Sequence, residues 1–105
     1  MSRYRLNDGT VVDTDLAVKH WKEATYSIPS MGLPLSKATR NWWSHQTLYL
    51  SRKGRFYIEQ TSDIETIPEG TVIAFINNRQ AVGWLIANDH EVPAELQSIA
   101  NDIVE

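Results

Sequence analysis

Three histidines, His20, His45 and His90, are the side chains best suited to proton transfer or metal binding, because imidazole alone ordinarily titrates between roughly pH 5 and 8. They lie far apart in the chain, and none belongs to a spacing such as His-Glu-x-x-His, which places two metal ligands on one helix face. The chain has no cysteine, so it lacks thiolate nucleophiles and the usual structural zinc ligands. The sequence therefore predicts no metal site.

The glycine motifs that hold phosphate or present a serine nucleophile are also missing. The five dispersed glycines form neither GxGxxG nor a P-loop, and no serine lies in GxSxG. Asp13 and Asp15 could imitate a pair of catalytic carboxylates, but capping and the helix dipole explain two acids at the start of a helix. We expect a protein that is not an enzyme, with no catalytic residue and no cofactor.

Length and composition indicate a small globular protein. The 105 residues fit one domain over residues 1–105, and four tryptophans, four tyrosines and two phenylalanines supply the bulk of a core. The first ten residues contain no apolar run of signal-peptide length, and no stretch approaches the roughly 18 apolar residues of a membrane span. The sequence predicts a cytoplasmic protein with no membrane contact.

Charge is distributed unevenly along the chain. Residues 1–55 hold nine Lys and Arg against four Asp and Glu, a net charge of +5, whereas residues 56–105 hold one against nine, a net charge of −8. Together they give the −3 of the whole chain. Such asymmetry indicates a nucleic-acid face, an acidic interaction surface, or two halves that fold together and partly neutralise each other.

The clearest element is LYLSRKGRFYIEQ, residues 48–60. Apolar residues alternate in two runs around a basic turn, which predicts a β-hairpin with one face in a core. Gly54 favours a type I turn closed by a glycine bulge, which places Arg52 and Lys53 at an exposed tip. The residues predicted to face the core are Leu48, Leu50, Phe56 and Ile58, and those predicted to face away are Tyr49, Ser51, Tyr57 and Glu59.

The first 41 residues predict a small hairpin, a helix and a long connection. Residues 4–12 reverse at an Asn-Asp-Gly turn, whose residues tolerate positive φ. From residue 13 or 14 to residue 25, apolar side chains at helical spacing predict an amphipathic helix. Residues 26–41 contain two prolines and are predicted to be irregular, with a short helical turn that starts at Ser36.

The last 35 residues predict one strand and two helices. Residues 71–76 are apolar on both faces, which is typical of an inner strand. Asn77 or Asn78 caps the first helix, in which Gly83 indicates close packing, and Pro93 begins the second. The predicted fold is α+β, a small antiparallel sheet packed with helices in the order ββαβββαα. The predicted core comprises Leu48, Leu50, Phe56, Ile58, Val72, Ile76, Leu85, Leu96 and Ile99.

Two segments, LYLSRKGRFY and AVGWLIANDHEVPAEL, resemble a group of small bacterial proteins. These share a hairpin of the form LY-x-S-x-KGR-aromatic-aromatic, followed by a helix with A-x-x-WL that stops at an amide or acidic residue. The resemblance covers residues 47–60 and 81–96, about a third of the chain, and Gln80 stands where a glutamate is common. The group has no function to carry over, but the frequent occurrence of such short proteins on mobile elements implies accessory or regulatory duty.

Three functions remain open from the sequence. The first is a non-catalytic protein-binding module, because aromatic and arginine side chains dominate interface energetics. The second is nucleic-acid binding by the basic hairpin tip, which the acidic net charge opposes and which an ordinary solvated turn would also explain. The third is an acidic nucleic-acid mimic, although a solubilising surface explains the same acids. Those acids are Glu59, Asp63, Glu65, Glu69, Asp89, Glu91 and Glu95.

A partner protein is the favoured ligand. We expect one of two adjacent tryptophans to be buried and the other to form one continuous exposed patch with the hairpin tip. The residues predicted to bind the partner are Trp42, Trp43, Tyr49, Arg52, Lys53, Arg55 and Tyr57.

Overall fold

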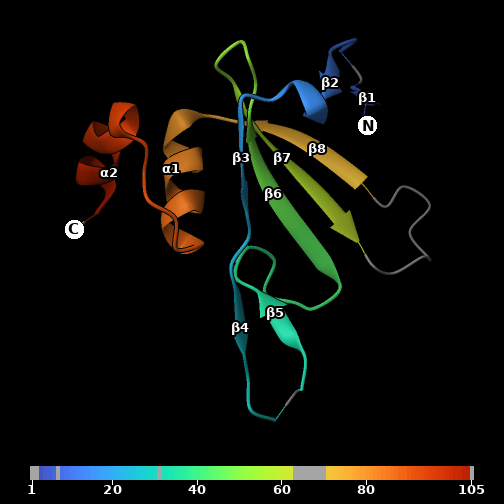
Figure 1. Cartoon of the computed structure of the whole chain (residues 1–105), viewed down its shortest axis with the longest axis vertical. Helices are drawn as coiled ribbons and strands as arrows, with labels where there is room; N and C mark the ends of the chain where they lie inside the picture. The colour runs from blue at the N-terminus through green and yellow to red at the C-terminus, as the bar shows by residue number, and fades with distance from the viewer. Residues whose placement is uncertain (1–2, 7, 31, 63–70, 105) are drawn as a thin grey trace.

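The computed structural model describes residues 3–6, 8–30, 32–62 and 71–104. Within these ranges the fold is α+β, as predicted, with a four-stranded antiparallel sheet, two two-stranded antiparallel sheets and two α-helices (Figure 1). The elements in chain order are β1 (Arg3–Arg5), β2 (Val11–Asp13), a 3-10 helix (Thr14–Leu16), β3 (Lys19–Lys22), β4 (Thr25–Ser27), β5 (Pro34–Ser36), β6 (Ser44–Leu50), β7 (Phe56–Ser62), β8 (Thr71–Ile76), α1 (Asn78–Ala87), a 3-10 helix (Ala94–Leu96) and α2 (Gln97–Ile103).

The β6–β7 hairpin forms the centre of the larger sheet, whose strand order is β3-β6-β7-β8. Gly54 has a φ of 81°, and its N–H donates to the Ser51 carbonyl at 2.9 Å, which gives the predicted turn and bulge. The register pairs Leu48 with Ile58 and Leu50 with Phe56. The predicted facing of this hairpin is therefore confirmed.

Both helices lie on one side of the larger sheet (Figure 1). The buried cluster beneath them joins β6 and β7 to both helices, and Leu50, Ile58 and Ile76 pack against it. On the same face, Trp84 Nε1 donates to Gln46 Oε1 at 2.9 Å. The buried members of this core are Leu48, Phe56, Ala81, Val82, Trp84, Leu85, Leu96 and Ala100.

The ends of α1 follow from local chemistry. Asn77 caps the N-terminus, where its side chain accepts from the Gln80 N–H and the Gln80 side chain accepts from the Asn77 N–H, a capping box. At the C-terminus, Asp89 adopts a φ of 64°, and the His90 N–H donates back to the Leu85 carbonyl at 2.9 Å. This is a Schellman motif with aspartate in the position that glycine usually takes.

The helix predicted from residue 13 or 14 to residue 25 is wrong. One 3-10 turn occupies Thr14–Leu16, and Lys19–Lys22 form β3, which pairs with β6 so that Trp21 lies opposite Leu48. Trp21 still packs against the core, but it does so from a strand. Pairing with the open edge of β6 overrides a weak helical pattern, and the order ββαβββαα is corrected accordingly.

The predicted irregular connection over residues 26–41 contains a further hairpin. The strands β4 and β5 pair antiparallel and project from the sheet at the end opposite the β6–β7 turn (Figure 1). Leu35 is buried there, and Pro34 takes the first position of its strand, where a missing donor is tolerated. The predicted turn at Ser36 is confirmed, because the Arg40 N–H donates to the Ser36 carbonyl at 2.7 Å.

The expectation that residues 71–76 form an inner strand is also wrong. In the described part of the chain, β8 pairs only with β7 and ends the sheet. Val72, predicted as core, is 57% exposed, whereas Ile76 at the other end of the strand packs against the core. An apolar run alone did not distinguish an inner strand from an edge strand that is covered at one end.

We predict that Leu48→Ala lowers the free energy of unfolding by about 2–5 kcal/mol, because Leu48 is fully buried between the sheet and the helices. Val72→Ala is the matched control and should change stability by less than about 0.5 kcal/mol. Denaturant melts measure both values. Equal losses at the two positions would show that the core lies elsewhere.

Gly83 lies inside α1, and a Cβ added there would meet no atom within 4 Å outside the helix, so the predicted close packing is wrong. Gly83→Ala should therefore raise the free energy of unfolding by roughly 0.5–1 kcal/mol, the helix-propensity difference.

Gly54→Ala should lower the free energy of unfolding by about 1–2 kcal/mol, because Gly54 has a left-handed φ. Denaturant melts of both variants test the pair, and a destabilised Gly83→Ala protein would contradict this packing.

Candidate functional site

Six of the seven residues predicted to bind a partner fall on two separate surfaces, and the seventh, Tyr49, lies in β6 between them. Trp42 and Trp43 immediately precede β6, whereas Arg52, Lys53 and Arg55 follow it in the turn to β7. The strand between them has seven residues, about 20 Å at the usual rise per residue. The prediction of one continuous patch is therefore wrong.

The first surface, here named the basic groove, lies between the N-terminal hairpin and the β6–β7 turn. It encloses a cavity of about 510 Å³ whose walls come from three distant parts of the chain. Its cationic residues are Arg3, Arg52, Lys53 and Arg55, its apolar residues are Val11, Val12, Leu16, Ala17 and Phe75, and Thr10, Asp13, Ser51 and Tyr57 complete it.

Cations outnumber carboxylates in the basic groove. Asp13 is the one acidic residue of its lining, and Arg3 Nε binds Asp13 Oδ2 at 2.9 Å. This hydrogen bond is the main reason why the pKa of Asp13 lies below its ordinary value. Within the described ranges, neither Arg52 nor Lys53 forms an ion pair. The turn therefore presents uncompensated positive charge.

Within the described residues, ion pairs between the two halves of the sequence are few. Among the ion pairs of the residues that the structure describes, only Lys37–Asp89, at 2.7 Å, joins residues 1–55 to residues 56–105. The basic groove instead gathers four cations of the first half. The acidic segment 63–70, which carries part of the nucleic-acid-mimic hypothesis, lies outside the described residues.

An aromatic row crosses the face of the sheet opposite the helices. It takes one residue from each strand, and the residues in order are His20, Tyr49, Tyr57 and Phe75. Neighbouring ring centroids lie 5.9, 5.1 and 5.7 Å apart, and the two tyrosines are stacked. The Arg55 guanidinium lies over the outer ring of this row, 3.8 Å from the Phe75 centroid.

The N-terminal hairpin covers part of this aromatic row. Val12 is buried, and Tyr4 Oη donates to Glu59 Oε2 at 2.8 Å, which ties β1 to β7. Tyr57 consequently keeps only 2% of its surface exposed, so its predicted exposure is wrong. Burial raises the pKa of Tyr57 to about 12, with further contributions from Tyr49 and Glu59. Its hydroxyl stays protonated at neutral pH.

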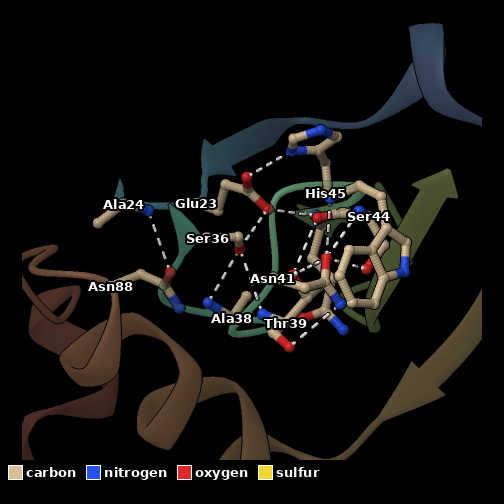
Figure 2. Close-up of polar contacts among 11 residues, drawn as sticks. Glu23, Ala24, Ser36, Ala38, Thr39, Asn41, Ser44, His45 and Asn88 are labelled. Atoms are coloured by element: carbon tan, nitrogen blue, oxygen red, sulfur yellow. Dashed lines mark hydrogen bonds and ion pairs between the residues drawn. The ribbon is translucent and has the colours of Figure 1, made fainter. Parts of the chain in front are cut away.

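The second surface, here named the tryptophan pair, consists of Trp42 and Trp43. Both indoles are exposed, by 42% and 38%, so the prediction that one is buried is wrong. Their rings meet edge to face, with centroids 5.7 Å apart and an angle of 84°. Asn41 Oδ1 accepts from the Trp43 N–H at 3.2 Å and the Ser44 N–H at 2.8 Å, which fixes the backbone that carries both indoles (Figure 2).

Glu23 lies beside this surface and was not identified from the sequence. Its carboxylate is 11% exposed and binds His45 Nδ1 at 2.8 Å through Oε2, while Oε1 accepts from Ser36 Oγ at 2.7 Å and from the Gln46 N–H at 2.6 Å (Figure 2). The sequence predicted a helix over this segment, and nothing in that pattern marked Glu23 as a site residue. The tertiary pairing of β3 with β6 creates its partners.

Serine, histidine and glutamate meet in this cluster, but not in a catalytic order. In a Ser-His-acid triad the imidazole lies between the hydroxyl and the carboxylate and takes the hydroxyl proton. Here the Glu23 carboxylate lies between Ser36 and His45. The Ser36 hydroxyl also accepts from the Ala38 and Thr39 N–H groups (Figure 2). The cluster therefore shapes the connection between β5 and β6.

The three histidines, singled out for their chemistry, lie in different environments. His20 belongs to the aromatic row, His45 binds Glu23, and His90 stacks on Trp84 with centroids 6.1 Å apart. Residues 3–6, 8–30, 32–62 and 71–104 contain no group of three or more potential ligands placed to hold a metal ion. Across the same residues, neither helix has the length and apolar character that a membrane crossing requires.

The two surfaces thus belong to an α+β protein with a helix-covered antiparallel sheet. Comparison of the chain with protein-family models, with curated proteins and with solved structures finds no match. The resemblance of residues 47–60 and 81–96 to small bacterial proteins stays a prediction.

The raised pKa of Tyr57 predicts that the folded protein loses stability at high pH. Its folded-state pKa of about 12 lies above the ordinary 10.0, so the folded protein keeps a proton that the unfolded chain loses over this interval. The contribution is fully present below about pH 10 and is lost as the pH rises towards about 12. Denaturant melts at increasing pH should show this loss in the wild type and a smaller one in Tyr57→Phe. The same loss in both proteins would contradict the assignment.

Proposed function

We propose that this protein is a non-catalytic binding module that docks on a partner protein through the tryptophan pair, in an accessory or regulatory role. The observation that carries the proposal is the exposure of two adjacent indoles on a backbone that side-chain hydrogen bonds hold in place. Tryptophan is among the residues most enriched at the energetic centres of protein interfaces. The regulatory role rests on the resemblance alone.

The restrained backbone beneath the tryptophan pair favours binding. Association costs free energy whenever it orders mobile side chains or loops, so a surface that is already ordered retains more of its contact energy. Asn41 Oδ1 also accepts from Ser44 Oγ at 2.8 Å, and Thr39 Oγ1 donates to the Ser44 carbonyl at 2.9 Å. Both contacts restrain the backbone on either side of the indoles.

A partner would bury the exposed parts of both indoles at once. The two nearly perpendicular rings together offer a larger and more specific shape than a single side chain does. Burial of aromatic area dominates the energetics of such contacts. We therefore place the energetic centre of the interface at this pair.

The test is affinity capture from a nuclease-treated lysate of the source cell, followed by measurement of the dissociation constant with the purified partner. The variant Trp42→Ala/Trp43→Ala should weaken binding by at least about 2 kcal/mol, roughly 30-fold, as loss of an interface anchor does. Survival of the complex after nuclease treatment is expected, because the proposal assigns the contact to protein.

The matched control is Val72→Ala/Val104→Ala, which removes two exposed apolar side chains from other surfaces. It should bind the partner as the wild type does, and circular dichroism should show that both double variants are folded. A partner that disappears after nuclease treatment, or one that binds the tryptophan variant with unchanged affinity, would overturn the proposal.

A further inference from the structure

We infer that the basic groove binds a nucleotide unit, a planar base joined to phosphate, either as a free nucleotide or within a single strand. The inference concerns a different surface from the tryptophan pair and goes beyond the proposed protein contact. It rests on a cavity in which clustered cations adjoin a guanidinium group that lies over an aromatic ring.

Phosphate recognition is assigned to the β6–β7 turn. Arg52, Lys53 and Arg55 lie within four residues, all exposed, and the glycine bulge holds the turn that displays them. The Ser51 hydroxyl accepts from the Arg55 N–H at 3.1 Å and so braces the turn internally. Arginine offers phosphate a planar fork of donors, and lysine adds a point charge.

Base recognition is assigned to Arg55 together with Phe75. The central carbon of the Arg55 guanidinium lies over the Phe75 ring, 3.8 Å from its centroid, and this contact restrains the side chain. Proteins stack nucleic-acid bases on aromatic rings and on arginine planes. A base on the outer face of Arg55 would complete a stack of three layers, while the N–H edge of the same group stays available for phosphate.

The opposite wall and the size of the cavity suit the same ligand. Val11 and Leu16 line it and are 61% and 48% exposed, so they offer apolar contact to the second face of a base. The volume of about 510 Å³ lies within the roughly 300–1,000 Å³ of small-molecule and cofactor sites. The cavity therefore accommodates one nucleotide unit, with the rest of any strand outside.

The carboxylates near the groove are already engaged. Asp13 binds Arg3, and Asp8 Oδ1 accepts from the Thr10 N–H at 2.9 Å. The hydrogen bonds from Thr10 are the main cause that lowers the pKa of Asp8, and the charge of Arg55 contributes. Asp8 therefore lies near enough to Arg55 to be affected by its charge. Neither acid pairs with Arg52 or Lys53, so within the described part of the chain the positive charges of these two residues are not neutralised by an ion pair.

The test titrates the full chain with adenosine diphosphate, and separately with a fluorescein-labelled single-stranded DNA of mixed sequence, at physiological salt. Amide shifts measured by nuclear magnetic resonance should map to residues 10–17, 51–55 and 75, and fluorescence anisotropy should give the affinity for the strand. Saturable binding of the diphosphate alone identifies a free nucleotide as the source. Binding of the strand, with affinity that falls linearly in the logarithm of the salt concentration, identifies single strands.

Three variants separate stacking from charge. Arg55→Lys keeps the charge but loses the plane, and it should weaken binding about tenfold or more, as loss of a stacked base does. Arg52→Ala should weaken binding and reduce the salt dependence for the strand by nearly one charge. Arg79→Ala, an exposed arginine that pairs with Asp102 beside the helices, is the matched control and should change neither.

Several results would overturn the inference. The first is that neither probe shows saturable binding at concentrations up to about 1 mM, the limit of weak specific affinity. The second is that the amide shifts map outside the groove. The third is that Arg55→Lys and the wild type bind with equal affinity. If pyrophosphate binds as tightly as adenosine diphosphate, the base contributes nothing to binding and the assignment of a base-binding site is wrong. An acidic peptide of glutamates that binds more tightly than either probe would assign the groove to protein instead.

Discussion

The register of the β6–β7 hairpin is the constraint on which the other features depend. The left-handed φ of Gly54 closes the turn, and the turn sets which residues of the two strands lie opposite each other. A slip of one residue in one strand would turn that strand's side chains to the opposite face of the sheet. If β7 slipped, Phe56 would leave the helices and Tyr57 would enter the core. One glycine conformation thereby separates the structural face from the face that carries the aromatic row.

A second constraint acts where the chain leaves the larger sheet for the β4–β5 hairpin. The Glu23 carboxylate lies between β3 and β4, is largely withdrawn from water, and contacts two other parts of the chain, Ser36 of β5 and the adjacent His45 and Gln46 of β6. Such a group is tolerated only when its acceptor positions are satisfied. Asn88 continues the connection towards α1, since its Oδ1 accepts from the Ala24 N–H at 3.0 Å (Figure 2). The projecting hairpin is thereby attached to both layers.

The elements that were predicted correctly carry strong local signals. The alternation around Gly54 and the capping residues of α1 each specify their structure within a short window. The segment that became β3 contains only four paired residues, and its structure depends on contact with β6, which no local pattern reports. For the same reason the sequence could suggest the basic turn but not the wall that the N-terminal hairpin provides. The burial of Tyr57 and the exposure of both tryptophans depend equally on distant segments.

The arrangement of the tryptophan pair has an optical consequence. Two indoles at 5.7 Å and 84° are close enough for their electronic transitions to couple, so the pair should produce an exciton couplet in the circular dichroism spectrum. The sign and size of that couplet depend on the angle between the rings. Because Asn41 holds the intervening backbone, the signal reports the geometry of this one loop rather than the helix content of the chain. The protein thus contains an intrinsic, label-free reporter at the surface proposed for docking.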